Sequence, residues 1–322
     1  MLTFDYELYL GIRSGSARKC LLEPTDALLA VFEKHGCAGI FFVDTLGLAC
    51  LKQQPETGRE YEAVAAQLKL LYQKGNYIFP HVHPHWLDAT YDASARQFSL
   101  NNISRYSLAA FAGEDVEELI RGSIVFLQEL GISYPNWGYR AGGWCIQPFS
   151  LFKPAFTSQN ILYDFSVLPG YKNNHAEQKF DFAHVKIKSP YTFENEVDKT
   201  IRNGAFTEFP ISALQLSRPA LLFSKLLAKY LWKKGDRGWG DGKSAQTAAL
   251  ACTKENTEML SLDLLTSTRL PAYKKFLEEN EYMHWISHPK MFTRHALKTF
   301  EKFIDFAHKH FEPEYDFKKI SF

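Results

Sequence analysis

Residues 76–86 read NYIFPHVHPHW, an apolar segment that ends in a cluster of three histidines, His81, His83 and His85. The aromatic and branched side chains before the cluster favour a β-strand. Pro84 cannot donate a backbone hydrogen bond to a sheet, so the strand should end within the cluster. Because uncharged imidazole is the commonest metal ligand among side chains, the cluster predicts a metal site at the end of this strand. A solvated, histidine-rich turn is the alternative.

Similar apolar segments recur along the chain and alternate with helical patterns. Strand-like stretches occupy residues 2–9, 38–44, 76–83, 136–144, 161–167, 205–212 and 282–288. A helical periodicity of apolar residues marks residues 26–35, 57–75, 115–131, 150–158 and 295–311. Strands that alternate with helices in this way predict βα units and a mainly parallel sheet. Seven such strands favour an α/β barrel or an incomplete barrel over an open sheet, with the functional site at the carboxyl ends of the strands.

Three stretches interrupt this alternation and are predicted to be insertions in a single domain, at about residues 86–112, 171–204 and 215–262. A chain of 322 residues suits one barrel with insertions or two ordinary domains. Within the third insertion, residues 218–234 form an amphipathic pattern flanked by lysines. A helix that covers the barrel is one interpretation of this pattern, and a peripheral contact with a membrane surface is the other.

The composition limits the classes of partner and location. The net charge is +1 with both signs interspersed, so the overall charge of the chain gives no electrostatic basis for binding nucleic acid or an anionic membrane. The five cysteines are scattered without a C-x-x-C pair, so we expect reduced thiols and no cysteine zinc site. The opening residues MLTFDYELYL lack the pattern of a signal peptide, and no apolar run is long enough for a membrane span. These features predict a cytoplasmic location.

The first predicted strand carries two carboxylates. In a β-strand, residues i and i+2 share a face, so Asp5 and Glu7 project together while Tyr6 points away. Acids at the end of an apolar strand are costly unless they are paired, solvated or bound to a cation. With two or three histidines, a carboxylate would complete the ligand set of a catalytic zinc-type centre, which keeps one position for water. An edge strand with solvated acids is the alternative.

Three further polar residues lie near the ends of predicted strands. Arg140, within GYRAGGW, is followed by two glycines that let the backbone approach a ligand closely. Asp164 is a charged residue inside the apolar pattern ILYDFSV, so it should have a partner, for which Arg140 and His288 are the candidates. His288 ends the last predicted strand, although a single histidine is more often structural than functional.

Seven short segments occur in a fixed order along residues 2 to about 300: LTFDYE, GIFFVDT, HVHPH, YRAGGW, YDFSVLPG, TEFPIS and SHPKMF. This ordered set resembles the polysaccharide deacetylase superfamily, also known as the NodB-homology or carbohydrate esterase family 4 group. It is most similar to the cytoplasmic branch associated with O-antigen and cell-surface polysaccharide synthesis. The resemblance implies a distorted (β/α)7 barrel that holds one divalent metal ion and hydrolyses N-acetyl groups of amino sugars.

The resemblance also implies roles for the acids and histidines. Asp5 matches the catalytic base of the family's Thr-Phe-Asp-Asp motif, but the next aspartate of that motif, a metal ligand, is Tyr6 in this sequence. We therefore expect Glu7 to be the carboxylate ligand, because it returns to the face of Asp5. His81 and His85 match the two metal histidines of the family's His-(Ser/Thr)-x-x-His motif.

Other positions follow the family pattern less closely. Val82 replaces the hydroxyl residue of the histidine motif, and His83 would support the ligands or substitute for one of them. Arg140 matches the arginine that orients the base, but Arg-Ala-Gly-Gly-Trp replaces Arg-x-Pro-aromatic, which leaves the oxyanion-binding amide open. His288 resembles the general acid, with Asp164 as its orienting partner. The predicted substrate-binding side chains are the aromatic residues beside these motifs, Trp86, Tyr139 and Trp144.

Together these interpretations predict a metal-dependent carbohydrate N-deacetylase that acts on an amino sugar of a surface-polysaccharide or lipid-linked precursor. Zinc is the expected ion, with nickel, cobalt and manganese as alternatives. Hydrolysis of another C–N bond, in a formamide or a cyclic ureide, is a rival activity on the same scaffold. The departures at Tyr6 and in RAGGW motivate a second rival, a catalytically silent sugar-binding protein.

Overall fold

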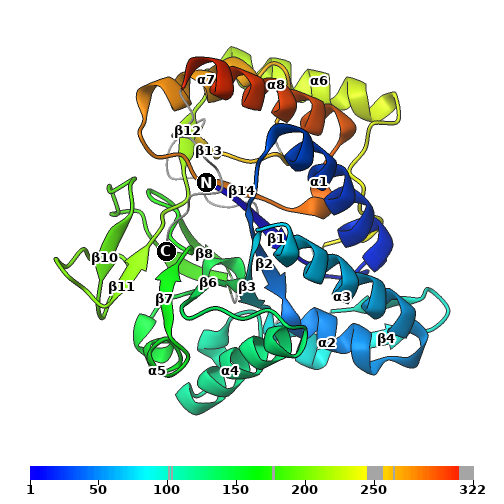
Figure 1. Cartoon of the computed structure of the whole chain (residues 1–322), viewed down its shortest axis with the longest axis vertical. Helices are drawn as coiled ribbons and strands as arrows, with labels where there is room; N and C mark the ends of the chain where they lie inside the picture. Colours follow the sequence, from blue (N-terminus) through cyan, green and yellow to red (C-terminus); the bar gives the residue numbers. More distant parts are fainter. Residues whose placement is uncertain (101, 103, 176–177, 245–256, 264, 312–322) are drawn as a thin grey trace.

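A curled sheet of eight strands forms the centre of the molecule (Figure 1). The computed structural model describes residues 1–100, 102, 104–175, 178–244, 257–263 and 265–311. The strands follow the order β10-β11-β7-β6-β3-β2-β1-β14 across the sheet. Their bounds are β1 (Leu2–Tyr6), β2 (Ile40–Asp44), β3 (Tyr77–Val82), β6 (Trp137–Ala141), β7 (Ile161–Asp164), β10 (Tyr191–Phe193), β11 (Phe206–Glu208) and β14 (Trp285–Ser287).

Every pairing in this sheet is parallel except that of β10 with β11. The parallel strands follow one another in chain order, and the last of them, β14, returns to lie beside β1. This is the strand order of a singly wound barrel, not of a doubly wound open sheet. The predicted α/β fold with a distorted barrel is confirmed, because each of the seven strand-like stretches contains one of these parallel strands.

The barrel closes between β11 and β14 through a bridging segment from the third insertion. Ser212, which follows β11, donates its backbone N–H to the carbonyl of His284 at 3.1 Å. The Ser212 carbonyl accepts the N–H of Leu260 at 2.9 Å, and the Leu260 carbonyl accepts the N–H of Ile286 in β14 at 3.0 Å. Residues around Leu260 therefore fill the seam between β11 and β14.

Helices surround the outside of this sheet in Figure 1. The α-helices of the described residues are α1 (Glu23–His35), α2 (Thr45–Gln53), α3 (Gly58–Gln73), α4 (Gly113–Glu129), α5 (Lys153–Ser158), α6 (Arg218–Lys233), α7 (Leu270–Glu279) and α8 (Arg294–His310). Five of them, α1, α3, α4, α5 and α8, overlap the periodic stretches of the sequence. Helices α2 and α7 were not expected. Helix α2 starts directly after β2, and Asp44, the last residue of the strand, is the N-cap of the helix. No loop residues therefore mark the boundary between strand and helix in the sequence.

Helix α1 illustrates how the outer layer packs. Its apolar stripe buries Leu28 and Phe32, and the Phe32 ring meets Phe4 of β1 edge-on at 5.8 Å between centroids. Gly36 ends the helix in the left-handed region, at a φ of 65°, where a residue without a Cβ is favoured.

The predicted insertions contain short hairpins and helix α6. Two hairpins pair β4 (Thr90–Asp92) with β5 (Gln97–Ser99) and β8 (Lys172–His175) with β9 (Gln178–Asp181). Strands β12 (Ala213–Gln215) and β13 (Thr257–Met259) also pair antiparallel, although helix α6 lies between them in the sequence. Parts of each insertion, including residues 245–256, lie outside the described residues. No described helix combines the length and the apolar character needed to cross a bilayer.

Candidate functional site

Strand β1 separates its apolar and polar side chains onto two faces. Phe4 packs against α1, and Tyr6 donates its hydroxyl to Gln67 Oε1 of α3 at 2.8 Å, so both point to the helix layer. Asp5 points to the inside of the curled sheet, and Glu7 continues that face just beyond the strand. The alternation of the strand thus places both carboxylates where the inward side chains of β3 and β6 also lie.

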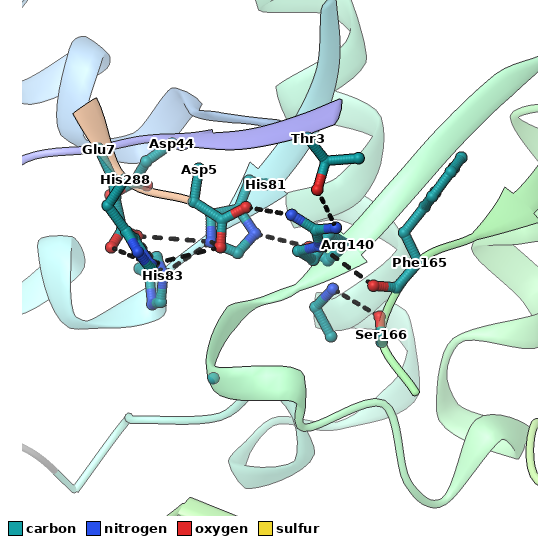
Figure 2. A network of polar contacts seen from close by, with 12 residues as sticks. Thr3, Asp5, Glu7, Asp44, His81, His83, Arg140, Phe165, Ser166 and His288 are labelled. Carbon is teal, nitrogen blue, oxygen red and sulfur yellow. Dashed lines mark hydrogen bonds and ion pairs between the residues drawn. The ribbon is translucent and has the colours of Figure 1, made fainter. Parts of the chain in front are cut away.

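Glu7, His81 and His83 converge inside the sheet (Figure 2). The Glu7 Oε2 atom lies 2.7 Å from His83 Nε2 and 3.4 Å from His81 Nε2. The two Nε2 atoms are 2.9 Å apart. His81 belongs to β3 and His83 follows it at a distance of two residues, so the strand alternation directs both rings to the same side. All three side chains are buried.

Hydrogen bonds from outside this group fix which atoms face its centre. His81 Nδ1–H donates to the carbonyl of Arg140 at 2.7 Å, which leaves the lone pair of His81 Nε2 directed at the other two residues. Lys290 Nζ donates to Glu7 Oε1 at 2.7 Å, which leaves Oε2 for the imidazoles. Burial on its own would raise the pKa of Glu7, but Lys290 and the two histidines outweigh it and hold the pKa well below its usual range. Glu7 is therefore ionised.

The donor atoms of this group fit one divalent cation. Glu7 Oε2 is buried without a hydrogen-bond donor among the described residues. A carboxylate oxygen and two imidazole nitrogens form the protein ligand set of several catalytic zinc sites, where each ligand atom lies about 2.0–2.2 Å from the ion. Ligand atoms that share an ion at such distances lie about 3 Å from one another, as these three atoms do.

Asp5 forms the second part of the site. Its Oδ1 atom accepts a hydrogen bond from Arg140 Nη1, and its Oδ2 atom lies 3.9 Å from His81 Nε2. Burial would raise the pKa of Asp5, but Arg140, His81 and His288 outweigh it, so the pKa lies below its usual range. The free carboxylate oxygen, Oδ2, therefore faces the histidine group in its ionised form.

Arg140 is held in place on all sides and is completely buried. Its Nη2 atom donates to Thr3 Oγ1 at 2.8 Å and to His284 Nε2 at 3.0 Å, and its Nε atom donates to the carbonyl of Phe165 at 3.1 Å. The guanidinium also lies 4.2 Å from the ring centroid of Phe42. Burial and the charge of Arg140 hold the pKa of His284 well below its usual range, so this histidine is neutral and accepts the guanidinium hydrogen bond.

His288 completes the site on its open side. Its Nε2 atom lies 3.6 Å from Asp5 Oδ2, and its Nδ1–H donates to Asp263 Oδ2 at 2.7 Å. Burial alone would lower the pKa of His288, but Asp263 outweighs it and raises the pKa. The His288 side chain is 25% exposed, against 7% or less for Asp5 and Glu7. Solvent and any substrate therefore reach the site from the His288 side.

Asp263 occupies the place beside His288 that the sequence assigned to Asp164. Asp164 lies instead at the end of β7, where Ser166 Oγ donates to its Oδ1 at 2.8 Å. Its neighbour is the buried Glu208 of β11, whose Oε1 accepts the N–H of Val167 at 3.0 Å. Burial and the adjacent Asp164 raise the pKa of Glu208 well above its usual range, so this carboxyl pair holds a proton.

The sequence predicted His81 and His85 as the two histidine ligands. In the structure, the second histidine beside Glu7 and His81 is His83. Pro84 begins a 3₁₀ turn, Pro84–Asp88, which ends the alternation of the strand and turns His85 onto another face. The His85 ring meets Tyr106 edge-on at 4.6 Å between centroids. Burial lowers the pKa of His85 to about 3, so this imidazole is neutral.

Two of the three aromatic side chains predicted to bind substrate have no face open to solvent. Trp86 is buried and donates its indole N–H to Asp44 Oδ2. Tyr139 is also buried and packs edge-on against Phe156 at 5.6 Å. Trp144 is half-buried, with its ring 5.8 Å from that of Phe180. Only Trp144 of these three could offer part of its surface to a sugar.

The glycines after Arg140 have a steric role beside the histidines. A Cβ at Gly142 would lie 2.5 Å from the carbonyl oxygen of Val82 and 2.9 Å from His83 Nδ1. A residue larger than glycine would therefore displace His83. The sequence indicated close backbone approach at this position, and the structure identifies the approaching group as an imidazole of the site.

A cavity of about 820 Å³ lies beside the β8–β9 hairpin. Its lining includes the side chains of Gln147, Asn173, Asn174 and Asn195. None of the residues of the site described above lines this cavity. Gln178 of the hairpin donates its side-chain N–H to the carbonyl of Gly143 at 3.1 Å, so the hairpin contacts the RAGGW segment next to the site.

Two members of the site carried no signal in the sequence. Asp263 comes directly after the third predicted insertion, outside every predicted strand and helix. Lys290 lies two residues after His288 within SHPKMF, and only its buried position shows that it pairs with Glu7. A lysine at such a place reads as an ordinary surface residue, because lysine is rarely fully buried.

Comparisons with known proteins find distant structural similarity only. No protein-family model matches this chain, and no curated protein does. A structure described as a polysaccharide deacetylase from Mycobacterium smegmatis aligns with 88% of this chain and 70% of its own, at 15% identity and a TM-score of 0.43. A family 4 carbohydrate esterase from Streptomyces lividans, in complex with acetate, aligns over 95% of this chain and 85% of its own, at 8% identity and a TM-score of 0.42.

The structure of Puue allantoinase gives a TM-score of 0.44 at 12% identity, over 96% of this chain and 83% of its own. The names of these similar structures thus include a polysaccharide deacetylase, a carbohydrate esterase and an allantoinase. Likeness at this level carries no activity from one protein to another, and the fold assignment stands on the strand order of the sheet.

Proposed function

We propose that this chain is a metal-dependent hydrolase that removes N-acetyl groups from an amino sugar. The observation that carries the proposal is the convergence of Glu7, His81 and His83 beside an ionised Asp5. The ordered sequence motifs support the acetylated amino sugar as the substrate class. A divalent ion held by these three side chains, with zinc as the expected one, would polarise the amide carbonyl and acidify a bound water.

Asp5 is the proposed general base. Arg140 occupies one oxygen of its carboxylate and keeps the pKa low, so the other oxygen is free to accept a proton from the attacking water. Arg140 is itself fixed by Thr3, His284 and the carbonyl of Phe165, which prevents the carboxylate from rotating away. This positioning is the kind of pre-organisation that removes reorientation from the reaction barrier.

His288 is the proposed general acid. An amide nitrogen leaves poorly as an anion, so the sugar amine must receive a proton as the C–N bond breaks. The Asp263 carboxylate accepts the Nδ1–H of His288, stabilises the protonated ring and leaves Nε2–H directed at Asp5 and the space beside it. As the partly exposed member of the site, His288 lies where a bulky leaving group can remain outside the barrel.

We further propose that the substrate is a precursor of a surface polysaccharide or a lipid-linked sugar. The reaction would take place in the cytoplasm. Cys20, Cys50 and Cys145 are free thiols, which supports a reducing compartment. The open side of the site at His288 supports a substrate that extends beyond the acetylated sugar, as a lipid-linked or polymeric precursor does.

The test combines metal analysis with acetate release. The purified protein is incubated with N-acetylated sugar nucleotides, lipid-linked sugars and oligosaccharides, with and without a chelator, while bound zinc, nickel, cobalt and manganese are quantified. We expect about one ion per chain and chelator-sensitive acetate release. Glu7→Gln and His83→Ala should lose both the ion and the activity, because each removes a ligand. His85→Ala is the matched control and should keep both.

The other outcomes of this test have defined meanings. Retention of the ion by His83→Ala and its loss in His85→Ala would refute the ligand set proposed here. Hydrolysis of formamides or cyclic ureides without acetate release would assign the site to another C–N bond. A protein that binds no metal ion and releases no product, but binds glycans, would be a catalytically silent sugar-binding protein.

A further inference from the structure

Helix α6 exposes an unusual set of apolar side chains. Leu222, Phe223, Leu226, Tyr230 and Trp232 are between 54% and 60% exposed. Among the described residues, these five make up most of the large apolar side chains that are more than half exposed. The helix runs along the outer edge at the top of Figure 1, drawn in yellow-green.

The barrel already occupies the opposite side of this helix. Ser224 is completely buried, and its hydroxyl lies 2.8 Å from Thr266 Oγ1. Leu227 and Leu231 are partly buried on the same side. With 3.6 residues per turn, Leu222, Leu226 and Tyr230 form a stripe on the side away from Ser224. An ordinary surface helix needs one apolar stripe to face its core, so the fold does not account for this second one.

The charges beside the exposed stripe all have one sign. Lys225, Lys229, Lys233 and Lys234 are exposed on or just after the helix. Residues 213–235 contain no aspartate or glutamate. A basic border around leucine and aromatic side chains is complementary to an anionic lipid surface, which offers phosphates to the lysines and acyl chains to the apolar stripe. A second copy of the chain would bring the same positive charges against each other across a two-fold axis.

We propose that α6 is a peripheral membrane-binding helix that docks the protein onto anionic bilayers. Leu222, Phe223 and Leu226 enter the boundary between headgroups and acyl chains. Tyr230 and Trp232 lie at headgroup level, where amphipathic aromatic rings are enriched. The lysines contact the phosphates of the lipid. The inference is independent of the proposed hydrolase activity, because it rests on the surface of α6 alone.

The helix is joined to the candidate site through two connections. Its anchor, Thr266, lies three residues after Asp263, the partner of His288. The segment that follows α6 reaches Lys290, where the N–H of Gly240 donates to the Lys290 carbonyl at 2.9 Å. Through these two connections, a membrane contact at α6 would be linked to both segments that flank the open side of the site.

The experiment is co-sedimentation of the full chain with vesicles. One set contains phosphatidylcholine alone, and the other contains phosphatidylcholine mixed with phosphatidylglycerol. We expect binding to the mixed vesicles, weakened by added salt, and little binding to phosphatidylcholine alone. The double variant K225Q/K229Q should bind the mixed vesicles at least about tenfold more weakly, since each lysine near an anionic surface contributes about fivefold to the affinity.

The apolar stripe is tested by the triple variant L222S/F223S/L226S, which should lose vesicle binding while its thermal unfolding is unchanged. The matched control is L70S/V125S, which removes exposed apolar side chains from α3 and α4. Equal binding to both vesicle types, or equal loss in the control, would overturn the inference. So would a wild-type dimer in light scattering that the triple variant converts to a monomer without any vesicle binding, because a second copy would then cover α6.

Discussion

Two pairs of acids buried at the ends of sheet strands have opposite protonation, Asp5 with Glu7 and Asp164 with Glu208. At the ends of β1 and β3, Asp5 and Glu7 lie among Arg140, Lys290 and histidines, and the pKa of each carboxyl is lowered. At the ends of β7 and β11, no lysine or arginine among the described residues forms a hydrogen bond with Asp164 or Glu208, and the pKa of each carboxyl is raised.

The difference shows that burial alone does not determine the charge of a carboxyl group. Desolvation is the largest influence on all four acids and raises the pKa of each. Only the first group has fixed cations strong enough to reverse this effect. The first group is therefore a set of charged, convergent donor atoms suited to metal and proton chemistry, whereas the second is a neutral structural pair that shares a proton.

The sharpest test of this comparison is Asp5→Asn, which keeps the shape of the base but removes its charge. If Asp5 accepts the proton of the attacking water, kcat should fall about 10²–10⁴-fold, or about 3–5 kcal/mol in the barrier. Bound metal, measured on the same sample, should stay near the wild-type amount. Asp92→Asn, at an exposed site on β4, is the control. A fall in kcat of less than a few-fold would contradict the role of Asp5.

The second test removes the counter-charge. Arg140→Met leaves Asp5 buried without its strongest partner, so the free energy of unfolding should decrease by about 3–5 kcal/mol. Denaturant titration measures the loss. Arg121→Met, which breaks an exposed pair with Glu118 on α4, should change it by less than about 1 kcal/mol. If the two variants lost equal amounts of unfolding free energy, the ionised Asp5 would not depend on Arg140.

The third test addresses the open side of the site. Asp263→Asn removes the carboxylate that orients His288, and kcat should fall about 10–100-fold with little change in the amount of bound metal. Another histidine–aspartate pair, His35 with the exposed Asp305 at 3.5 Å, supplies the control variant Asp305→Asn. An unchanged kcat in Asp263→Asn would exclude His288 as the general acid in the form proposed here.

The smallest effect is expected in the neutral pair. Above the usual carboxyl pKa of about 4.3, folded Glu208 keeps a proton that the unfolded chain has lost, so native stability falls as pH rises toward the raised folded-state pKa. Glu208→Gln cannot titrate, and its unfolding free energy should decline less over this range, while differing by only about 1 kcal/mol at acidic pH.

Unfolding series at several pH values measure this slope. Glu196→Gln, an exposed carboxylate paired with Lys199, should leave the slope as it is in the wild type. A variant of Glu208 with the wild-type slope would show that the pair is ionised, and the contrast between the two groups of acids would be lost.

The sequence predicted the fold well because its strands are short apolar segments with clear ends. The two-residue period of β1 also predicted that Asp5 and Glu7 share a face. The same period holds for His81 and His83, but the spacing of the family motif favoured His85. Only the structure shows that the turn at Pro84 carries His85 away from the other donor atoms.

The remaining site residues depend on tertiary contacts that no local pattern records. Asp263 directly follows the third predicted insertion and reaches His288 across 25 residues of sequence. Lys290 approaches Glu7 from the other end of the chain. Trp86 and Tyr139 were predicted to bind substrate because they lie beside the motifs in the sequence, but their side chains are buried in the interior. Burial of an aromatic residue depends on the packing of helices against the sheet, which spacing alone does not determine.

The bridging segment at the seam links the closing of the barrel to the assembly of the site. Leu260 joins Ser212 to Ile286, and Asp263 follows three residues later. A chain in which this segment is detached would keep its donor atoms at Glu7 and His81 but would lack the partner of its proposed acid. The amides of Leu260 and Ile286 form the hydrogen bonds of this seam. Slow hydrogen exchange at these two amides would therefore measure the fraction of molecules in which the seam is closed and Asp263 can orient His288. Exchange at the other strands would not distinguish these molecules from those with an open seam.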